Sequence, residues 1–459
     1  MQWTRPKGPE CCRPPGRSGG RPPGRTAALA GFGAALLLFA LIAAVLPTRD
    51  LDLGVYWQAA QRTFVAEVDP YPRGEGEQLP FTYPPTALFL LYPFSRLDLA
   101  ESARWMWGLN LLLVPVLMWL LVSDLARTQP ESGTLAEVDD ERAGLLSGRR
   151  LRVWGPLYVA SFGGLYLTLH FHQVNLLILL CLWFYWRALR LGRAGFRAGA
   201  ALALSAVAKP HYGLLLLAAL RWPAVSIRNG QGPGLIPRPV VGAVVAGLLL
   251  LGLSLLIAPV GSWGSWLTLV LGNTSFTELP PGHSSIAAPW NRSIPGELAR
   301  LLIPNKFSQP ILVSPSAAAW LSRLVVAMLL AATLWALLGA LRARAPNASR
   351  PDPRTIDLEL SLLSVLVFLA APASWTHHLV MLLPAALVLL RDAVLDPRES
   401  VGSRLTAALV LAVLALTLDD LIPREVRVSS QAIMGLMTVA VLSLWCLLMQ
   451  RLYRSTICP

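Results

Sequence analysis

The sequence predicts an all-α polytopic membrane protein. Hydrophobic residues make up 54% of its 459 residues and charged residues only 14%, which is more apolar than a soluble core of this length requires. Apolar runs such as 26–47 and 239–259 are long enough to cross a hydrocarbon core of about 30 Å. Because backbone polar groups in lipid must be satisfied within their own segment, we expect helices throughout.

Apolar runs separated by polar or proline-containing breaks predict about twelve helices. In chain order they are expected at 26–47, 103–124, 154–170, 174–187, 198–209, 212–223, 239–259, 316–341, 358–372, 376–391, 404–418 and 430–450. The runs 198–209 and 212–223 are short for a full span, which tilt or a break at proline would accommodate. The run 85–97 is also short, and we expect it to be re-entrant or partly inserted.

The remaining segments divide the chain into a tail and one membrane domain. Residues 1–25 are basic and rich in proline and glycine, so we expect a disordered tail before a domain at 26–459. Two long polar stretches, about 48–84 and about 260–315, are expected to be outer loops. The stretch 125–152 ends in arginines, so we expect it to be a cytoplasmic loop.

The formal net charge of +13 follows the membrane rather than a nucleic-acid partner. Only three of the 39 basic residues are lysines, and the arginines gather in short loops between apolar runs. Such loops mark the cytoplasmic side of a membrane protein, so we expect cytoplasmic termini and no nucleic-acid binding. Arginine-rich, lysine-poor usage is typical of a GC-rich bacterial genome and favours the bacterial cell (inner) membrane.

Ionisable and amide side chains gather on the face opposite the arginine loops. Asp50, Asp52, Gln173, Asn175 and Lys209 are predicted to lie there. All six histidines share this face: His170, His172, His211, His283, His377 and His378. Membrane interfaces favour Trp, Tyr, Lys and Arg but do not call for this grouping, and ionisable groups beside membrane segments usually mark functional sites.

Each of these residues also has a purely structural interpretation. Asp50 or Asp52 could cap a helix, and Gln173 and Asn175 could cap the next one. Lys209 stands before a proline at a helix end and could extend to the membrane interface. These alternatives stay open at the level of the sequence.

No metal or other cofactor is predicted. Adjacent residues on a helix do not share a face, so His377 or His378 fits a phosphate partner or proton shuttle better than a metal pair. The chain has no G-x-x-x-x-G-K-S/T, G-x-G-x-x-G or H-E-x-x-H motif. A nucleotide-sugar donor and ATP drive are therefore not expected, and substrates should arrive through the membrane.

Several short motifs follow one another in a specific order. They are Asp52-x-x-x-Tyr56-x-x-Ala59, Asp69-Pro70-Tyr71, Tyr83-Pro84-Pro85, Gln173-Val174-Asn175, Ala208-Lys209-Pro210, Asn291-Arg292-Ser293 and Ser374-Trp375-Thr376-His377-His378. Together they resemble glycosyltransferase family 87, the polyprenyl-phosphate-mannose-dependent mannosyltransferases of the GT-C class. His172 departs from this pattern, because the family commonly has glycine there.

The resemblance implies a GT-C-like bundle whose outer loops carry the active site. It also implies an inverting transfer of a hexose, with mannose expected, from a polyprenyl-phosphate-sugar to a glycolipid or glycan. Asp52 would be the general base, with Asp50 as its rival. Lys209, Arg292 and His377 or His378 would bind the donor phosphate. The candidate substrate-binding residues are Tyr56, Tyr71, Tyr83, His172, Gln173, Asn175, His211, Asn291 and Trp375.

The main alternative is a membrane transporter or flippase of lipid-linked sugars. Such a protein would also be polytopic, but it should place its ionisable groups near the bilayer midplane and often show two repeated halves. The chain shows no convincing repeat, and its polar groups lie on one predicted face. An enzyme is therefore the favoured interpretation.

Overall fold

The computed structural model describes residues 23–71, 79–127, 135–221, 237–273, 276, 285–342, 352–417 and 431–457. Within these ranges the backbone forms helices and shorter helical turns, with one isolated bridge between Asn291 and Trp375 and no strand. The all-helical prediction is thus confirmed for the described part of the chain. Most of the predicted tail at 1–25, and His283, lie outside the described residues.

Six helical segments among the described residues are long and apolar enough to cross a membrane. They are α1 (Pro23–Val45), α4 (Leu99–Leu125), α10 (Arg238–Ile257), α13 (Pro315–Arg342), α19 (Gln431–Ile457) and the continuous run of η5 (Thr376–Leu382), α15 (Leu383–Leu389) and η6 (Leu390–Val394). The count of about twelve spanning helices is not confirmed, because the other described helices are shorter or more polar.

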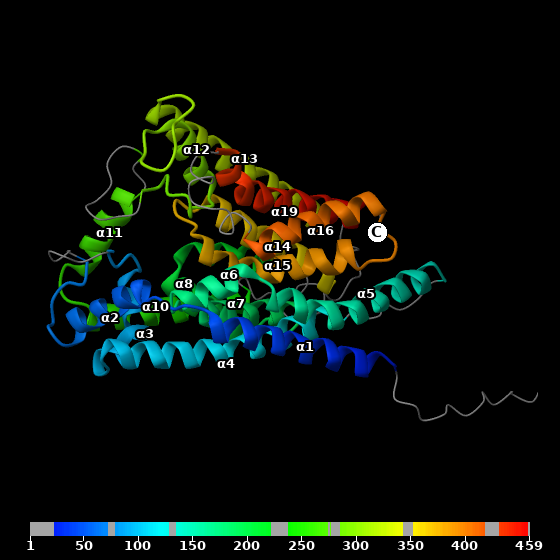
Figure 1. Cartoon of the computed structure of the whole chain (residues 1–459), viewed down its shortest axis with the longest axis horizontal. Helices are drawn as coiled ribbons and strands as arrows, with labels where there is room; N and C mark the ends of the chain where they lie inside the picture. Colours follow the sequence, from blue (N-terminus) through cyan, green and yellow to red (C-terminus); the bar gives the residue numbers. More distant parts are fainter. Residues whose placement is uncertain are drawn as a thin grey trace, which may run out of the picture.

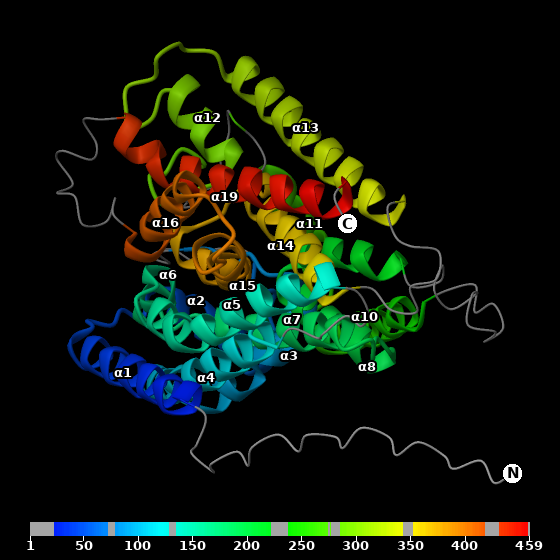
Figure 2. The same ribbon diagram turned by 90° about the vertical axis from the view of Figure 1, so that its right-hand side faces the viewer.

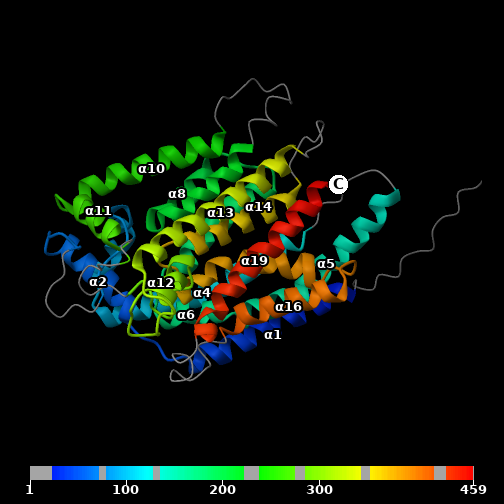
Figure 3. The ribbon, with the colours of Figure 1, turned by 90° about the horizontal axis from the view of Figure 1, so that it is seen from above.

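The helices pack in two groups, as the view in Figure 2 separates them. The first group comprises α1, α4, α10, α5 (Leu135–Ala160), α6 (Gly163–His170), α7 (Asn175–Arg190) and α8 (Phe196–Ala208). The second comprises α13, α15, α19, α14 (Pro353–Ala370) and α16 (Val401–Leu416). Because α14 contacts both α7 and η3 (Pro210–Arg221), it joins the two groups. Seen from above, α10 and α8 lie together along one edge (Figure 3).

Both predicted outer loops contain helices. The first holds α2 (Leu51–Phe64), which buries Leu53, Tyr56, Ala59, Ala60 and Thr63 at helical spacing. The second holds α11 (Ser262–Asn273) and α12 (Ile294–Leu302). In Figure 1, α2 and α11 lie at the same end of the molecule, away from the C-terminus. Amphipathic helices this short do not produce a long apolar run, so apolar runs in the sequence do not predict them.

Two further predictions need correction. The expected cytoplasmic loop 125–152 is helical from Leu135 onward, as the first part of α5. The helix expected at 154–170 is two helices, α5 and α6, because the backbone of Phe162 is extended and separates them. Gly164 then packs closely against η5, since a Cβ there would lie 2.9 Å from the Val380 nitrogen. The run 85–97 forms three short elements, η1 (Pro85–Ala87), α3 (Leu88–Leu91) and η2 (Tyr92–Arg96), and its re-entrant or partial insertion stays a prediction.

Two glycines allow the α8 and α10 backbones to touch. A Cβ on Gly199 would collide with the carbonyl of Pro239, and a Cβ on Gly242 would collide with that of Phe196. Only 11% of the apolar window of α10 is buried, so its remaining surface faces outward. Contact with α8 therefore attaches α10 to the bundle while most of its side chains stay available to lipid.

Several arginines form ion pairs with buried carboxylates rather than lying in solvated loops. Arg391 Nη1 lies 2.7 Å from Asp357 Oδ2, and Arg190 Nε lies 3.2 Å from Asp357 Oδ1. Arg187 Nε lies 2.9 Å from Asp124 Oδ2. These five residues, which we call the arginine end, connect α4, α7, α14 and η6.

Replacing Asp357 by alanine is expected to lower the free energy of unfolding by about 3–5 kcal/mol, because Arg190 would stay buried without its paired carboxylate and Arg391 would keep only Asp392. Thermal unfolding of the purified protein in detergent measures this. Arg96→Met is the control, since Arg96 contacts Tyr92 at the surface, and a change within about 0.5 kcal/mol is expected there. Equal midpoints for both variants would contradict a stabilising role for the arginine end.

Candidate active site

The turn between α6 and α7 holds the first outer loop against the membrane helices. His172 has a left-handed backbone (φ 51°), which reverses the chain after α6. The Arg49 N–H donates to the His170 carbonyl at 2.8 Å, and His172 Nδ1 lies 3.1 Å from Asp50 Oδ1. Asp50 stands at the N-cap of α2 but makes no capping hydrogen bond with its side chain. These contacts place the first turn of α2 beside Gln173.

Asp52 lies at the end of a chain of side-chain hydrogen bonds. Gln173 Nε2 donates to Asp52 Oδ2 at 2.5 Å, and the Tyr56 hydroxyl donates to Gln173 Oε1 at 2.6 Å. The Tyr56 and Tyr83 hydroxyls are 2.9 Å apart. The side chains of Tyr56 and Gln173 are buried. Four predicted site residues from three separate motifs therefore meet, which the sequence did not require.

Tyr71 fixes the loop that carries Tyr83. Its hydroxyl donates to the Tyr83 carbonyl at 2.7 Å, and its N–H donates to Asp69 Oδ1 at 3.2 Å. The other oxygen of Asp69 accepts from the Ser265 hydroxyl at 2.5 Å, which ties this loop to α11. The geometry thus gives Tyr71 a structural role, while its predicted contact with substrate stays a prediction.

Lys209 projects from the end of α8 into the same region. The helix ends there because Pro210 disfavours a helical conformation at the preceding residue. Lys209 Nζ donates to Asn175 Oδ1 at 2.8 Å, and its exposed fraction is 5%. Asn175 Nδ2 in turn donates to the His377 carbonyl at 3.5 Å. We call the region around Asp52, Gln173 and Lys209 the site end.

The two charged groups of the site end influence each other. Burial raises the pKa of Asp52 from 3.8 to about 6, although the hydrogen bond from Gln173 and the charge of Lys209 oppose the rise. Burial lowers the pKa of Lys209, and the charge of Asp52 opposes that change. Perturbed carboxyl and amine groups that interact in a partly buried region are typical of catalytic sites.

A second pair of loops meets directly before His377. The Arg292 N–H donates to the Ser374 carbonyl at 2.7 Å, and the Thr376 N–H donates to the Trp290 carbonyl at 2.9 Å. Arg292 Nε also donates to the Thr376 hydroxyl at 3.2 Å, directly before His377. The Asn291 side chain is fully buried and bonds to the backbone of both loops. Asn291 therefore holds Arg292 in place, and its contact with substrate stays a prediction.

The remaining predicted residues surround this core. Asn175 links Lys209 to the His377 carbonyl, His378 follows His377 in η5, and His211 follows Lys209 by two residues at the start of η3. His378 Nδ1 accepts a hydrogen bond from the N–H of Trp375, so one of its two ring nitrogens is already bonded to the neighbouring backbone. Among the described residues, no group of three or more His, Cys, Asp or Glu side chains is arranged to hold a metal ion.

Sequence reasoning missed two buried polar residues that support the site. Asn110 in α4 donates from Nδ2 to the Gln173 carbonyl at 3.1 Å, and its exposed fraction is 1%. The Thr168 hydroxyl donates to the His377 carbonyl at 3.1 Å. Asn110 gave a signal that could have been used, because a single amide inside an apolar span is costly and usually has a partner.

The family model described as Glycosyltransferase family 87 matches residues 81–351, which is more than half of the chain. The chain belongs to glycosyltransferase family 87. It is therefore a transferase enzyme, and with six helical segments that could cross a membrane among its described residues it is an integral membrane protein. No curated protein and no solved structure matches the chain.

The family 87 match includes some of the site and leaves out the rest. Gln173, Asn175, Lys209 and Arg292 lie inside the matched range. Asp52 precedes that range, so its assignment depends on its hydrogen bonds and on its position beside Gln173.

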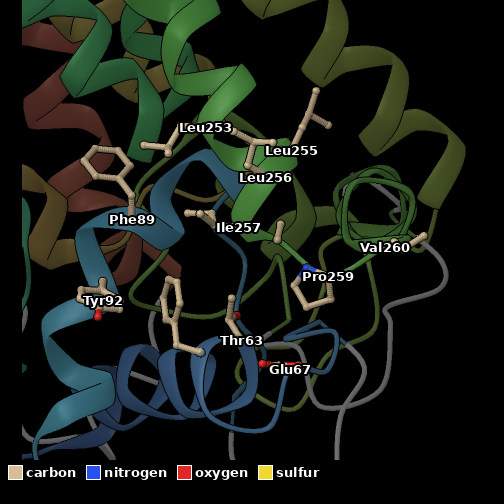
Figure 4. Close-up of a pocket in the computed structure, with 12 residues that line it drawn as sticks. Thr63, Glu67, Phe89, Tyr92, Leu253, Leu255, Leu256, Ile257, Pro259 and Val260 are labelled. Carbon is tan, nitrogen blue, oxygen red and sulfur yellow. The ribbon is translucent and has the colours of Figure 1, made fainter.

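A separate groove of about 780 Å³ lies beside the outer part of α2 (Figure 4). Thr63 and Glu67 line one side, Phe89 and Tyr92 a second side, and apolar residues from Leu253 to Val260 a third. None of the predicted site residues lines it. Its mostly apolar walls suit a hydrocarbon chain better than a sugar.

Proposed function

We propose that this family 87 enzyme is an inverting glycosyltransferase that uses a polyprenyl-phosphate-sugar as donor. The sugar is a hexose, with mannose as the first candidate, and the acceptor is a glycolipid or glycan. The observation that carries the proposal is the site end itself, where a partly buried carboxylate and a buried lysine interact. An inverting transfer from a lipid phosphate needs one group of each kind.

The transfer is a single displacement. The acceptor hydroxyl gives its proton to the Asp52 carboxylate, and its oxygen forms a bond to the anomeric carbon of the donor sugar. The bond between that carbon and the phosphate oxygen breaks, and polyprenyl phosphate leaves with the electron pair. Lys209 and Arg292 stabilise the negative charge that develops on the leaving phosphate. Asp52 supplies one carboxylate, as an inverting transfer requires.

A lipid donor agrees with the surroundings of Lys209. Its ammonium group is buried at the junction of α8 and η3, two helices that contact α10. The Thr86 hydroxyl of η1 donates to the Val207 carbonyl at 3.0 Å, next to this junction. A compact ammonium in this position suits a phosphate whose hydrocarbon chain extends among membrane helices. We propose that the site end faces the non-cytoplasmic side of a bacterial cell membrane.

A direct transfer assay tests the proposal. Purified protein in lipid vesicles is incubated with polyprenyl-phosphate-[radiolabelled]mannose and a total lipid extract. We expect the label to appear in a new glycolipid or glycan and not in free mannose. If the donor stays intact, glucose and arabinose donors are tested next. Movement of intact donor across the vesicle membrane without transfer would support a transporter instead.

The pH dependence of kcat/KM follows from the two shifted groups. Asp52 must be ionised to accept a proton, and its raised pKa of about 6 means that activity falls tenfold per pH unit below that value. Lys209 must be protonated to stabilise the phosphate. Because its pKa is lowered, activity should decline on the alkaline side at a lower pH than an ordinary lysine would cause. We expect a bell-shaped profile. A flat profile between pH 4 and pH 6 would contradict Asp52 as the base.

A further inference from the structure

The hydrogen bonds at Asp52 have a defined direction. Gln173 Oε1 carries no proton, so the Tyr56 hydroxyl must donate to it. Tyr56 has only that one proton, and therefore the Tyr83 hydroxyl must donate to the Tyr56 oxygen. Gln173 then uses Nε2, which can only donate, toward Asp52 Oδ2. All three bonds point toward the carboxylate, and successive bonds of this kind strengthen one another.

We propose that Gln173 is a positioning residue of the reaction. Supported by Tyr56 and Tyr83, it holds the Asp52 carboxylate ionised and leaves Oδ1 as the oxygen that takes the acceptor's proton. This inference rests on the proposed function of Asp52 as the base. It differs from the sequence-based prediction that the Gln173 amide binds sugar hydroxyls, because each end of that amide already makes a hydrogen bond to a protein group.

The assignment of Oδ1 follows from the occupancy of the other oxygen. Oδ2 accepts the 2.5 Å bond from Gln173, and none of the described residues hydrogen-bonds to Oδ1. Asp52 lies in the first turn of α2 and is partly exposed, so Oδ1 is accessible to a substrate hydroxyl. A carboxylate with one oxygen fixed and one free has a defined orientation toward its proton donor.

The backbone of Gln173 is also fixed, because both its carbonyl and its N–H are hydrogen-bonded. Its carbonyl accepts from Asn110 Nδ2 at 3.1 Å, and its N–H donates to the Thr168 carbonyl at 3.0 Å. Its exposed fraction is 3%. The amide therefore has little freedom to leave Asp52, as a positioning group requires.

The charged and titratable groups that face Asp52 are few. They are Lys209 at the end of α8, Tyr56 on the same helix and Tyr83 before η1. Asp50, near the start of α2, is paired with His172. Of these neighbours only Lys209 favours the ionised carboxylate by charge, and the hydrogen bond from Gln173 lowers the pKa of Asp52 more than that charge does.

Replacing Gln173 by leucine tests the inference through the pH profile. The acid limb of the kcat/KM profile is expected to move to higher pH by about one to two units, because the Asp52 carboxylate loses a hydrogen bond that favours its charged form. Gln61→Leu is the matched control: Gln61 lies on α2, as Asp52 does, and among the described residues its amide bonds to the carbonyls of Phe94 and Ser95. Gln61→Leu should leave the acid limb in place. Tyr83→Phe should shift it in the same direction by a smaller amount.

A measurement without turnover keeps the inference testable if Gln173→Leu is inactive. Infrared difference titration follows the protonated carboxyl band that disappears in Asp52→Asn, and this band should appear at higher pH in Gln173→Leu. A raised KM for the acceptor with an unmoved acid limb and band would overturn the inference in favour of sugar binding. A wild-type protein that transfers no sugar would overturn the proposed function instead, while the titration would still report on Gln173.

Discussion

Asp52→Asn is expected to lower kcat of sugar transfer by about 10²–10⁴-fold, the usual contribution of a general base. Asparagine keeps the size of the side chain, but its amide cannot take the proton of the acceptor hydroxyl. The KM for the donor should change little, because the phosphate is expected to bind at Lys209. The measurement is steady-state transfer of radiolabelled sugar at saturating donor, with protein folding checked by thermal unfolding.

Asp50→Asn is the matched control for this variant. Asp50 is next to the same helix start, but its carboxylate is 47% exposed and pairs with His172. It should retain activity within about tenfold of the wild type, a far smaller loss than that of a general base. Full activity in Asp52→Asn together with a large loss in Asp50→Asn would exchange the roles of the two residues.

Lys209→Met is expected to lower kcat/KM for the donor by about 10²–10³-fold, the range seen when a group that stabilises developing negative charge is removed. Methionine fills a similar volume without the ammonium, and it leaves Asn175 without the donor that now lies 2.8 Å from Oδ1. The KM for the acceptor should stay near its wild-type value. Initial rates at varied donor and varied acceptor separate the two effects.

Lys306→Met is the control for loss of a lysine. Lys306 Nζ lies over the ring of Phe307, at 5.3 Å from its centroid, and has no described contact with the site end. Its kinetic constants should match those of the wild type. A Lys209→Met variant that binds donor normally but acceptor poorly would contradict the phosphate role. Lys209→Arg should not restore full activity, because the bulkier guanidinium must enter a space where lysine is 5% exposed.

The residue types of the site could be predicted from the sequence, but their connections could not. Motif order suggested Asp52, Gln173 and Lys209 separately, and the structure brings the first two into contact. That contact depends on α2 folding as an amphipathic helix onto the turn after α6, which no apolar run indicates. Asn110 was missed for the opposite reason, since a single polar residue inside a long apolar run does not change its prediction as a helix.

The helices in the membrane region were easier to predict than the polar network between them. Starts and ends such as Pro315 and Ala370 agree with the apolar runs to within a few residues. The arginines were interpreted as loop charges, but Arg190 and Arg391 are buried against Asp357. The sequence shows how many basic residues a loop holds. Which of these residues are buried depends on carboxylates that lie far away in the sequence.

The positions of the site end and the arginine end on α7 have a consequence for how this enzyme can change. Asn175 begins the helix and Arg190 ends it, so the two regions are about 22 Å apart at 1.5 Å per residue. Substitutions separated by this distance usually act independently. Selection for a new donor or acceptor can therefore alter one end of α7 while the ion pairs at the other end preserve expression yield, which makes the scaffold tolerant of functional divergence.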